Sequence, residues 1–346
     1  MEKEALLGKT IIDLQEIVAE HGLPRFTASQ IADWIYKKKV GNFDDMSNLS
    51  KKARTILLEN YTIGKIDHTN VQESADRTKK YLFPSGEHNF IEAAYIPEEK
   101  RNTLCISTQA GCKMGCLFCM TGKQGFQANL SPGEIINQLW NLPERDEVSN
   151  LVFMGMGEPF DNMDNLMKSL EILTAPWGME MSPKRITVST IGIIPAMSRF
   201  IEESECHLAV SLHTPFEEER KQLMPIENVY HLPDIFNLLK SYDIPRQRRI
   251  SFEYIMFRGL NDSRRHVNEL VRLIHGLKAR INLIRFHPVP GTPLEGSADK
   301  TIFEFKDALN AKGVTTTIRA SRGLDIAAAC GLLSTKELLK KEEKDF

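Results

Sequence analysis

Gly111-Cys112-Lys113-Met114-Gly115-Cys116-Leu117-Phe118-Cys119 is the stretch that decides the fold. Its cysteines follow the pattern Cys112-x-x-x-Cys116-x-x-Cys119, and the glycines allow the backbone to curl around them. Three soft thiolate ligands in one short loop suit an iron–sulfur cluster with one iron left open. A structural zinc ion is the alternative, but zinc normally takes four ligands and no second pair at zinc-finger spacing follows.

Short β-rich runs alternate with amphipathic stretches of helix length from about residue 100 onward. The predicted strands are 103–108, 151–154, 185–190, 207–213, 250–257 and 281–287, with a possible edge strand at 315–319. The predicted helices between them are 132–140, 163–173, 232–239, 263–277 and 303–311. This alternation indicates βα units and a parallel sheet. Six such units predict an α/β fold of the partial (β/α)6, TIM-like barrel type.

The first hundred residues predict a separate accessory part. Helical spacing covers 10–21, 27–38 and 50–60, with Thr27 and Ser50 as N-caps and Gly22 and Gly41 as stops. Residues 79–83 and 88–95 predict a β-hairpin around Pro84-Ser85-Gly86. We therefore expect a small helical domain at 1–70, a hairpin linker at 71–98, the barrel at 99–320 and a C-terminal segment at 321–346. From Ser334 the charged tail is expected to be helical.

Composition excludes several classes of protein. The 346 residues include 44 basic and 46 acidic side chains, so nucleic acid is not bound by bulk positive charge. A local basic face is predicted within 241–290, from Arg246, Arg248, Arg249, Arg258, Arg264, Arg265, Arg272, Lys278, Arg280 and Arg285. No run approaches the roughly 20 apolar residues of a membrane helix, and no signal peptide is evident, so we expect a cytoplasmic protein. In that compartment, six cysteines favour metal binding or chemistry over disulfides.

Polar residues gather where the predicted strands end. In parallel barrels the active site lies at the C-terminal ends of the strands. The cysteine loop follows the first predicted strand. The later strands end at Gly157 and Glu158, at Ser189, at Ser211-Leu212-His213 and at His287. These residues are expected to share one rim and to form a single site.

The cysteine spacing is the signature of the radical S-adenosylmethionine (SAM) superfamily, and further motifs narrow the resemblance. These motifs are Thr103-Leu104-Cys105-Ile106-Ser107, Thr121-Gly122-Lys123-Gln124-Gly125-Phe126, Gly155-Met156-Gly157-Glu158-Pro159 and Ala328-Ala329-Cys330-Gly331. Together with the cysteine loop they resemble the RlmN/Cfr family over nearly the whole chain. The resemblance implies a radical SAM barrel and methylation of C2 of an adenine in 23S rRNA and of the adenine 3′ of the anticodon in tRNA.

The resemblance also implies roles for individual residues. Cys112, Cys116 and Cys119 match the ligands of a [4Fe–4S] cluster, and two SAM molecules are consumed per turnover. SAM contacts match Gly157, Glu158, Ser189, Ser211, Leu212, His213 and His287. Cys330 matches the cysteine that carries the methyl group, Cys105 the one that releases the product through a transient disulfide, and Glu92 the base. The expected partners are the RNAs and a low-potential donor such as flavodoxin or ferredoxin, and the expected state is a monomer.

Without the resemblance, three of these residues attract no attention. Cys330 resembles an inert thiol at an apolar helix end, Cys105 lies in an apolar strand, and Glu92 alternates outward on a hairpin. Cys206 is expected to be a core residue. His287 stands where many relatives have Asn, and it can donate and accept as Asn does. Two alternatives stay open: Cfr-like methylation of adenine C8, and a non-catalytic RNA-binding protein with a structural metal.

Overall fold

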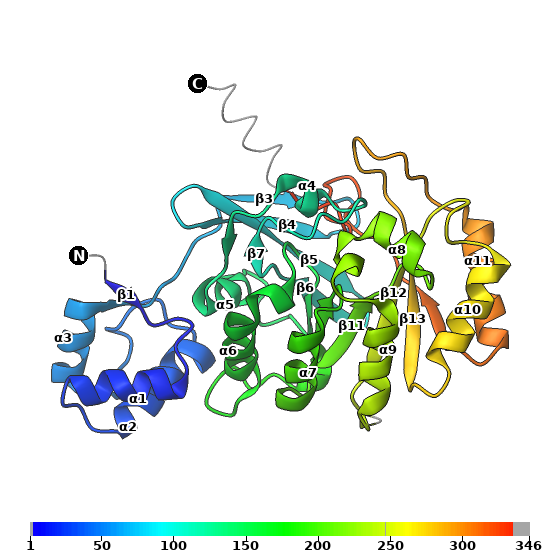
Figure 1. Cartoon of the computed structure of the whole chain (residues 1–346). Coiled ribbons are helices and arrows are strands. Elements are labelled where there is room, and N and C mark those ends of the chain that lie inside the picture. Colours follow the sequence, from blue (N-terminus) through cyan, green and yellow to red (C-terminus); the bar gives the residue numbers. More distant parts are fainter. Residues whose placement is uncertain (1–2, 246, 335–346) are drawn as a thin grey trace.

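A ten-stranded mixed sheet forms the centre of the computed structural model, which describes residues 3–245 and 247–334 (Figure 1). Its strand order is β14-β13-β12-β11-β10-β9-β6-β5-β4-β3. Within the described residues no helix is long and apolar enough to cross a membrane. The helix expected beyond Ser334 lies outside the described residues.

Seven parallel strands form the barrel part of the sheet, and they confirm the runs predicted from sequence. They are β6 (Arg101–Cys105), β9 (Asn150–Phe153), β10 (Ile186–Thr190), β11 (His207–Ser211), β12 (Ile250–Met256), β13 (Ala279–Arg285) and β14 (Thr316–Ile318). In this order β14 is the sheet edge and does not pair with β6. The barrel is therefore open along one side, as the partial-barrel prediction requires.

Helices connect these strands, and most of them cover the outer face of the barrel, whereas α8 lies at its site end (Figure 1). They are α5 (Pro132–Trp140), α6 (Met163–Thr174), α7 (Ile194–Glu203), α8 (Glu217–Leu223), α9 (Leu232–Ser241), α10 (Arg264–Ile274) and α11 (Asp299–Ala311). The sequence analysis missed α7 and α8. Pro195 lies in the first turn of α7, where proline is favourable, although it resembles a helix breaker when read in isolation.

The predicted hairpin forms, but it continues the barrel sheet instead of acting as a separate linker. Its strands are β4 (Lys79–Ser85) and β5 (Asn89–Glu98), with β3 (Asn70–Glu73) beyond β4. β5 pairs antiparallel with β6, and Ala94 lies opposite Cys105. The hairpin thereby places Glu92 one strand away from a cysteine of the predicted site.

The N-terminal part contains β1 (Glu4–Ala5), α1 (Ile11–Glu20), α2 (Phe26–Ala32), a π-helical turn (Asp33–Lys37), α3 (Lys51–Asn60) and β2 (Tyr61–Thr62). Ser50 caps α3 as predicted, through a hydrogen bond from the Ala53 N–H. The prediction for Thr27 is wrong, because α2 begins at Phe26 and Thr27 is buried within it. The Gly41 stop is also wrong: the π-helical turn ends at Lys37, and Lys39 takes the left-handed conformation with φ 55°.

Two close contacts join this N-terminal part to α5. The Trp140 indole N–H donates to the Ile35 carbonyl at 2.6 Å. Gly8, with φ 94°, lies so close to the start of α5 that a Cβ there would be 2.2 Å from the Gly133 nitrogen. Gly8 and Gly133 are therefore both needed where the N-terminal segment crosses the start of α5.

Four smaller elements complete the site end of the barrel. They are β7 (Gln109–Ala110), β8 (Ala128–Asn129), the short helix α4 (Met120–Gln124) and a 3₁₀ turn (Pro159–Asn162). β7 and β8 pair with each other and flank the cysteine loop. They anchor that loop at both of its ends.

The basic residues predicted to form one RNA-binding face have different roles in the structure. Five pair with carboxylates: Arg258, Arg265, Arg272, Lys278 and Arg285. Arg246 lies outside the described residues. Arg248 is structural: it donates to the Phe200, Ile201 and Cys206 carbonyls at 2.9, 2.6 and 2.9 Å. The Phe200 carbonyl also accepts from the Ser204 N–H at 3.1 Å, whereas Ile201 lies in the last turn of α7, where carbonyls have no partner within the helix.

We therefore expect Arg248→Ala to act on stability. Removing the guanidinium leaves carbonyl groups without their donors, which lowers the free energy of unfolding by roughly 2 kcal/mol. Urea denaturation followed by circular dichroism measures this change. The control is Arg272→Ala, which removes an exposed arginine paired only with Glu269 on the same helix. Equal unfolding midpoints for the two variants would show that Arg248 has no structural role.

Candidate active site

The cysteine loop is held by backbone contacts at each of its turns. The Cys112 N–H donates to the Gly125 carbonyl at 3.1 Å, and the Leu117 N–H donates to the Leu223 carbonyl at 2.9 Å. Gly111 has φ 71°, and a Cβ there would be 1.7 Å from the Gly125 oxygen. Only glycine fits at this position, because a side chain would displace the loop closure.

The three cysteines of this loop line one cavity. Burial raises the pKa of Cys112 to about 12, and burial together with the neighbouring cysteines raises the pKa of Cys116 and of Cys119. The three sulfurs do not all lie within 4.8 Å of one another. Around one zinc ion, with Zn–S bonds near 2.3 Å, they would be about 3.8 Å apart. The spacing of the donor set therefore fits the wider span of a cluster better than a single zinc ion.

A cavity of about 140 Å³ lies over the three cysteines. Nine residues of the predicted site line it: Cys112, Cys116, Cys119, Gly157, Glu158, Ser189, Ser211, His213 and Cys330. The structure thus brings most of the predicted rim together. Leu212 is fully buried and does not line this cavity, and its N–H donates to the Glu253 carbonyl at 3.0 Å.

Glu158 is buried at this cavity with an almost complete set of donors. Its carboxylate accepts hydrogen bonds from the Thr190 hydroxyl at 2.6 Å and from the Ile191 and Phe160 N–H groups at 3.0 and 3.1 Å. Burial raises its pKa to about 7, although the bond from Thr190 acts in the opposite direction. The carboxylate is therefore fixed in place and titrates near neutral pH.

His213 is held as a neutral imidazole. Its Nδ1 accepts a hydrogen bond from the Ile255 N–H at 3.0 Å, so the proton is on Nε2. Burial lowers its pKa to about 3, and the nearby Arg220 contributes in the same direction. Its backbone is left-handed, with φ 57°, and the Asn261 side chain fixes it by donating to the His213 carbonyl at 2.6 Å. His213 thus presents a fixed N–H donor at the cavity.

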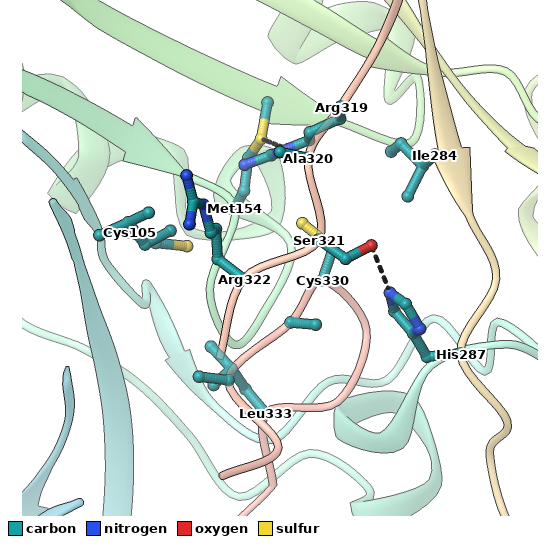
Figure 2. Close-up of a pocket in the computed structure, with 13 residues that line it drawn as sticks. Cys105, Met154, Ile284, His287, Arg319, Ala320, Ser321, Arg322, Cys330 and Leu333 are labelled. Atoms are coloured by element: carbon teal, nitrogen blue, oxygen red, sulfur yellow. Dashed lines mark hydrogen bonds between the residues drawn. The ribbon is translucent and has the colours of Figure 1, made fainter. Parts of the chain in front are cut away.

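Cys105, Cys330 and His287 line a second, smaller cavity (Figure 2). Both cysteines are free, as are all six in the chain. Burial, together with the nearby Cys330, raises the pKa of Cys105 to about 12, while Arg319 opposes the rise. His287 shares a hydrogen bond of 3.0 Å with the Ser321 hydroxyl and faces this cavity instead of the one over the cluster loop. Cys330 lines both cavities and so connects them.

Arg319 is the site residue that the sequence analysis missed. It follows β14, and its guanidinium donates to the Met154 sulfur at 3.0 Å (Figure 2). The electrostatic interaction with Cys330 is the largest cause that raises the pKa of Arg319, and burial opposes it. The strand-end rule could have found it, because 315–319 was predicted as a strand and Arg319 is its last residue.

Glu92 was expected to look like a surface residue, and that expectation is wrong. Its side chain is buried, with Lys80 at 3.0 Å from one oxygen and the Ser334 N–H donating to the other at 2.9 Å. The surface assignment assumed a free hairpin, whereas β5 has neighbours on both sides and is covered by the C-terminal segment. Glu92 does not line the cavity of Cys105 and Cys330 in this conformation.

The open barrel with three clustered cysteines at its rim defines a radical SAM enzyme. The model of the radical SAM superfamily matches residues 106–274, and that of the ribosomal RNA large subunit methyltransferase N-terminal domain matches residues 5–63. A crystal structure of a radical SAM methyltransferase from Sphaerobacter thermophilus is 36% identical, with a TM-score of 0.89 over 95% of this chain and 99% of that one.

Curated relatives agree over the full length. The probable dual-specificity RNA methyltransferase RlmN of Bacteroides thetaiotaomicron is 54% identical over 100% of this chain and 99% of the relative. The dual-specificity RNA methyltransferase RlmN of Nitratiruptor sp. is 40% identical over 95% of this chain and 98% of the relative. The chain belongs to the RlmN family of radical SAM RNA methyltransferases. Membership implies a [4Fe–4S] cluster and SAM, and the C8-methylating alternative is not favoured.

Two glycines of the cysteine loop offer a matched test of its closure. Gly111 and Gly115 have φ 71° and 66°, so an alanine at either position has a left-handed backbone, which costs about 1–2 kcal/mol. Only Gly111→Ala adds a clash, because the nearest atom to a Cβ at Gly115 is 3.8 Å away. After anaerobic reconstitution, we expect Gly111→Ala to lose most of its iron and visible absorbance and Gly115→Ala to retain them. Equal iron content in both would contradict this account of the loop.

Proposed function

We propose that the protein transfers a methyl group from SAM to C2 of an adenine in 23S rRNA and of the adenine 3′ of the anticodon in tRNA. The observation that carries this proposal is the placement of Cys105 and Cys330 at one cavity next to the cluster loop. Adenine C2 lies between two ring nitrogens and is electron-poor, so it does not attack a SAM methyl group. A carbon radical can add to it, and a methyl carrier beside a radical-generating pocket meets that need.

Cys330 is the proposed methyl carrier, and its sulfur takes a methyl group from a first SAM. Cys112, Cys116 and Cys119 would hold the cluster, which together with a second SAM would supply the radical chemistry for removal of a hydrogen atom from this methyl group and for uptake of one electron from the RNA adduct. The position of Cys330 on both cavities supports the role, because the residue must meet SAM on one side and RNA on the other. The resulting methylene group joins Cys330 to C2 of the adenine.

Cys105 is the proposed resolving residue. Its thiolate attacks the Cys330 sulfur, so that an S–S bond forms and the bond from that sulfur to the transferred carbon breaks. The carbon keeps the electron pair and takes a proton. Arg319 supports this step, because its positive charge opposes the effect of burial on the pKa of Cys105 and so favours the attacking thiolate. A dithiol reductant then restores both cysteines.

Glu92 is the proposed base for the C2 proton. Its burial beside Lys80 supports the role, because the ammonium group favours the carboxylate form that accepts a proton. The carboxylate oxygen now bonded to the Ser334 N–H would exchange that bond for the proton of C2. This exchange requires the C-terminal segment to move when RNA binds.

The rim residues are proposed to hold SAM. Glu158 accepts hydrogen bonds from its amino group, Ser189 and Ser211 bind its ribose or carboxylate, and Gly157 presents backbone groups. Leu212, whose N–H and carbonyl are bonded to Glu253 and Thr214, would act by positioning Ser211 and His213. His213 donates from Nε2, while His287 would reach SAM only from the smaller cavity that it lines. The proposed electron donor is a low-potential protein such as flavodoxin or ferredoxin.

The two cysteine variants test the proposed function. With SAM, a reductant and an RNA fragment, Cys330→Ala should keep its cluster absorbance and form no methylated RNA. Cys105→Ala should accumulate RNA attached covalently through Cys330, because no thiolate can break the thioether. A denaturing gel detects this adduct, and the double variant should lack it. Release of free methylated RNA by Cys105→Ala would remove Cys105 from the mechanism.

The product itself tests the position of methylation. Mass spectrometry of digested RNA separates C2-methyl from C8-methyl adenosine, and we expect only the C2 isomer. An RNA with guanine in place of the target adenine should bind but not react, because phosphate contacts do not depend on the base. The C8 isomer would overturn the proposed position, and no methylated product from wild type would overturn the function.

The pKa of Glu158 makes SAM binding depend on pH. Burial favours the protonated carboxyl group of Glu158 in the folded protein. The contribution of this group to the free energy of unfolding is therefore complete below the unfolded pKa of 4.5 and is lost as pH rises through about 7. The carboxylate that accepts from SAM prevails above about 7. We expect the dissociation constant of SAM to fall up to about tenfold between about pH 6 and about pH 8. In Glu158→Gln this dependence should be weaker, and the titration of SAM itself cancels in the comparison. Identical pH profiles would exclude this role.

A further inference from the structure

The interior of this barrel is polar where closed barrels are packed with apolar side chains. Alternate residues of each strand point inward, and in closed barrels Val, Ile and Leu fill these positions. In this chain the inward residues near the start of the strands are Thr103, Asn150, Thr187, Ser251, Asn282 and Thr317. They leave a cavity of about 500 Å³ at the end of the barrel opposite the cluster loop, which we call the basal cavity. An interior of this polarity is suited to a polar occupant.

Positive charge dominates the basal cavity. Seven basic side chains and two carboxylates line it. Arg249 precedes β12 and Arg280 lies in β13, so the two guanidinium groups come from neighbouring strands. In the part of the chain that the structure describes, neither has a carboxylate within 4.0 Å. In this respect Arg249 and Arg280 differ from other arginines of the same stretch. Each of those is paired with a carboxylate on the outer surface: Arg258, Arg272 and Arg285.

The cations of the basal cavity act on one another. Burial lowers the pKa of Arg249, and Arg280 and Arg101 lower it further. Burial also lowers the pKa of His207 to about 4, with Arg249 and Arg280 as the next causes. His207 therefore stays neutral, and its Nδ1 accepts a hydrogen bond from the Arg249 N–H at 3.0 Å. Uncompensated positive charge of this kind favours an anionic ligand.

The basal cavity adjoins the cavity of the reactive cysteines. It shares Ile96, Met154, Arg319, Ala320 and Arg322 with the cavity of Cys105 and Cys330. These shared residues come from β5, the end of β9 and the segment after β14, so they lie on the side where the barrel is open. Figure 2 shows Arg319, Arg322, Cys105 and Cys330 around the cavity of the reactive cysteines. An RNA strand that placed a base at the cysteines would thus have its flanking phosphates near the basal cavity.

We propose that the basal cavity binds phosphodiester groups of the substrate RNA, with Arg249 and Arg280 as the principal contacts. The proposal rests on the proposed function, and it adds where the RNA backbone lies. RNA enters along the open side between β14 and the β5–β6 pair and places the target adenine beside Cys330. The adenine must leave its stack to do so, and phosphate contacts on its flanking nucleotides hold the strand in that position.

The test uses an anticodon stem–loop RNA hairpin with adenine 3′ of the anticodon, and binding is measured by fluorescence anisotropy without SAM. We expect the double variant Arg249→Ala/Arg280→Ala to raise the dissociation constant about tenfold and to reduce the salt slope by about 1.4, for two contacts at about 0.7 each. Cluster absorbance and methylation of Cys330 should match wild type, because neither requires RNA. A double lysine variant should recover most of the affinity.

The matched control is Arg258→Ala/Arg272→Ala, which removes two paired arginines on the outer surface. We expect this control to bind the hairpin as wild type does. Equal losses of affinity in the two double variants would mean that only total charge matters, and this would overturn the proposal. Unchanged affinity and salt slope in Arg249→Ala/Arg280→Ala would overturn it as well. If inorganic pyrophosphate displaced the hairpin from wild type but not from that variant, a phosphate site would be supported; displacement from both would contradict it. The measurement does not depend on methylation, so failure of the proposed function would be recognised separately.

Discussion

β14 and β6 do not pair, and much of this architecture follows from that gap. A closed parallel barrel satisfies every edge and fills its interior with side chains. Here the edge at β14 is open, and the C-terminal segment lies across the site end of the barrel. It is fixed there by the Met120 N–H, which donates to the Gly331 carbonyl at 2.8 Å, and by the Thr121 hydroxyl, which donates to the Leu333 carbonyl at 2.7 Å. The gap thus allows a residue near the C-terminus to reach the centre of the barrel.

Burial sets the chemistry of the thiols in this interior. Each of the four thiols at Cys105, Cys112, Cys116 and Cys119 has a raised pKa because the charged form loses its hydration. A positive group must offset this cost wherever a thiolate is required. Iron would do so at the cluster loop, and Arg319 does so beside Cys105 and Cys330. Cys206 is also buried, but it lies in the hydrophobic core and is not part of the site.

Sequence patterns predicted the strands and the rim because both depend on local periodicity. All seven barrel strands and most of the site residues follow from the rule that parallel strands end at one edge. Burial of Glu92 could not be predicted in this way, because it depends on β5 pairing with β6 and on the C-terminal segment covering it. The errors at Thr27 and Gly41 differ, because their capping roles were assigned from residue type alone, whereas α2 begins at Phe26 and the π-helical turn ends at Lys37.

The arrangement of charged side chains could not be predicted from the sequence either. A net charge of −2 and a list of ten basic residues in one stretch give no indication of how those residues are arranged. The fold sorts them by environment: Arg248 binds backbone carbonyls, and Arg272 pairs with a carboxylate on its own helix. Arg249 and Arg280 instead line the basal cavity, where neither has a carboxylate within 4.0 Å among the described residues, so both keep their attraction for an anion. A nearly neutral protein can therefore bind a polyanion, because affinity depends on the few cations that the fold leaves unpaired.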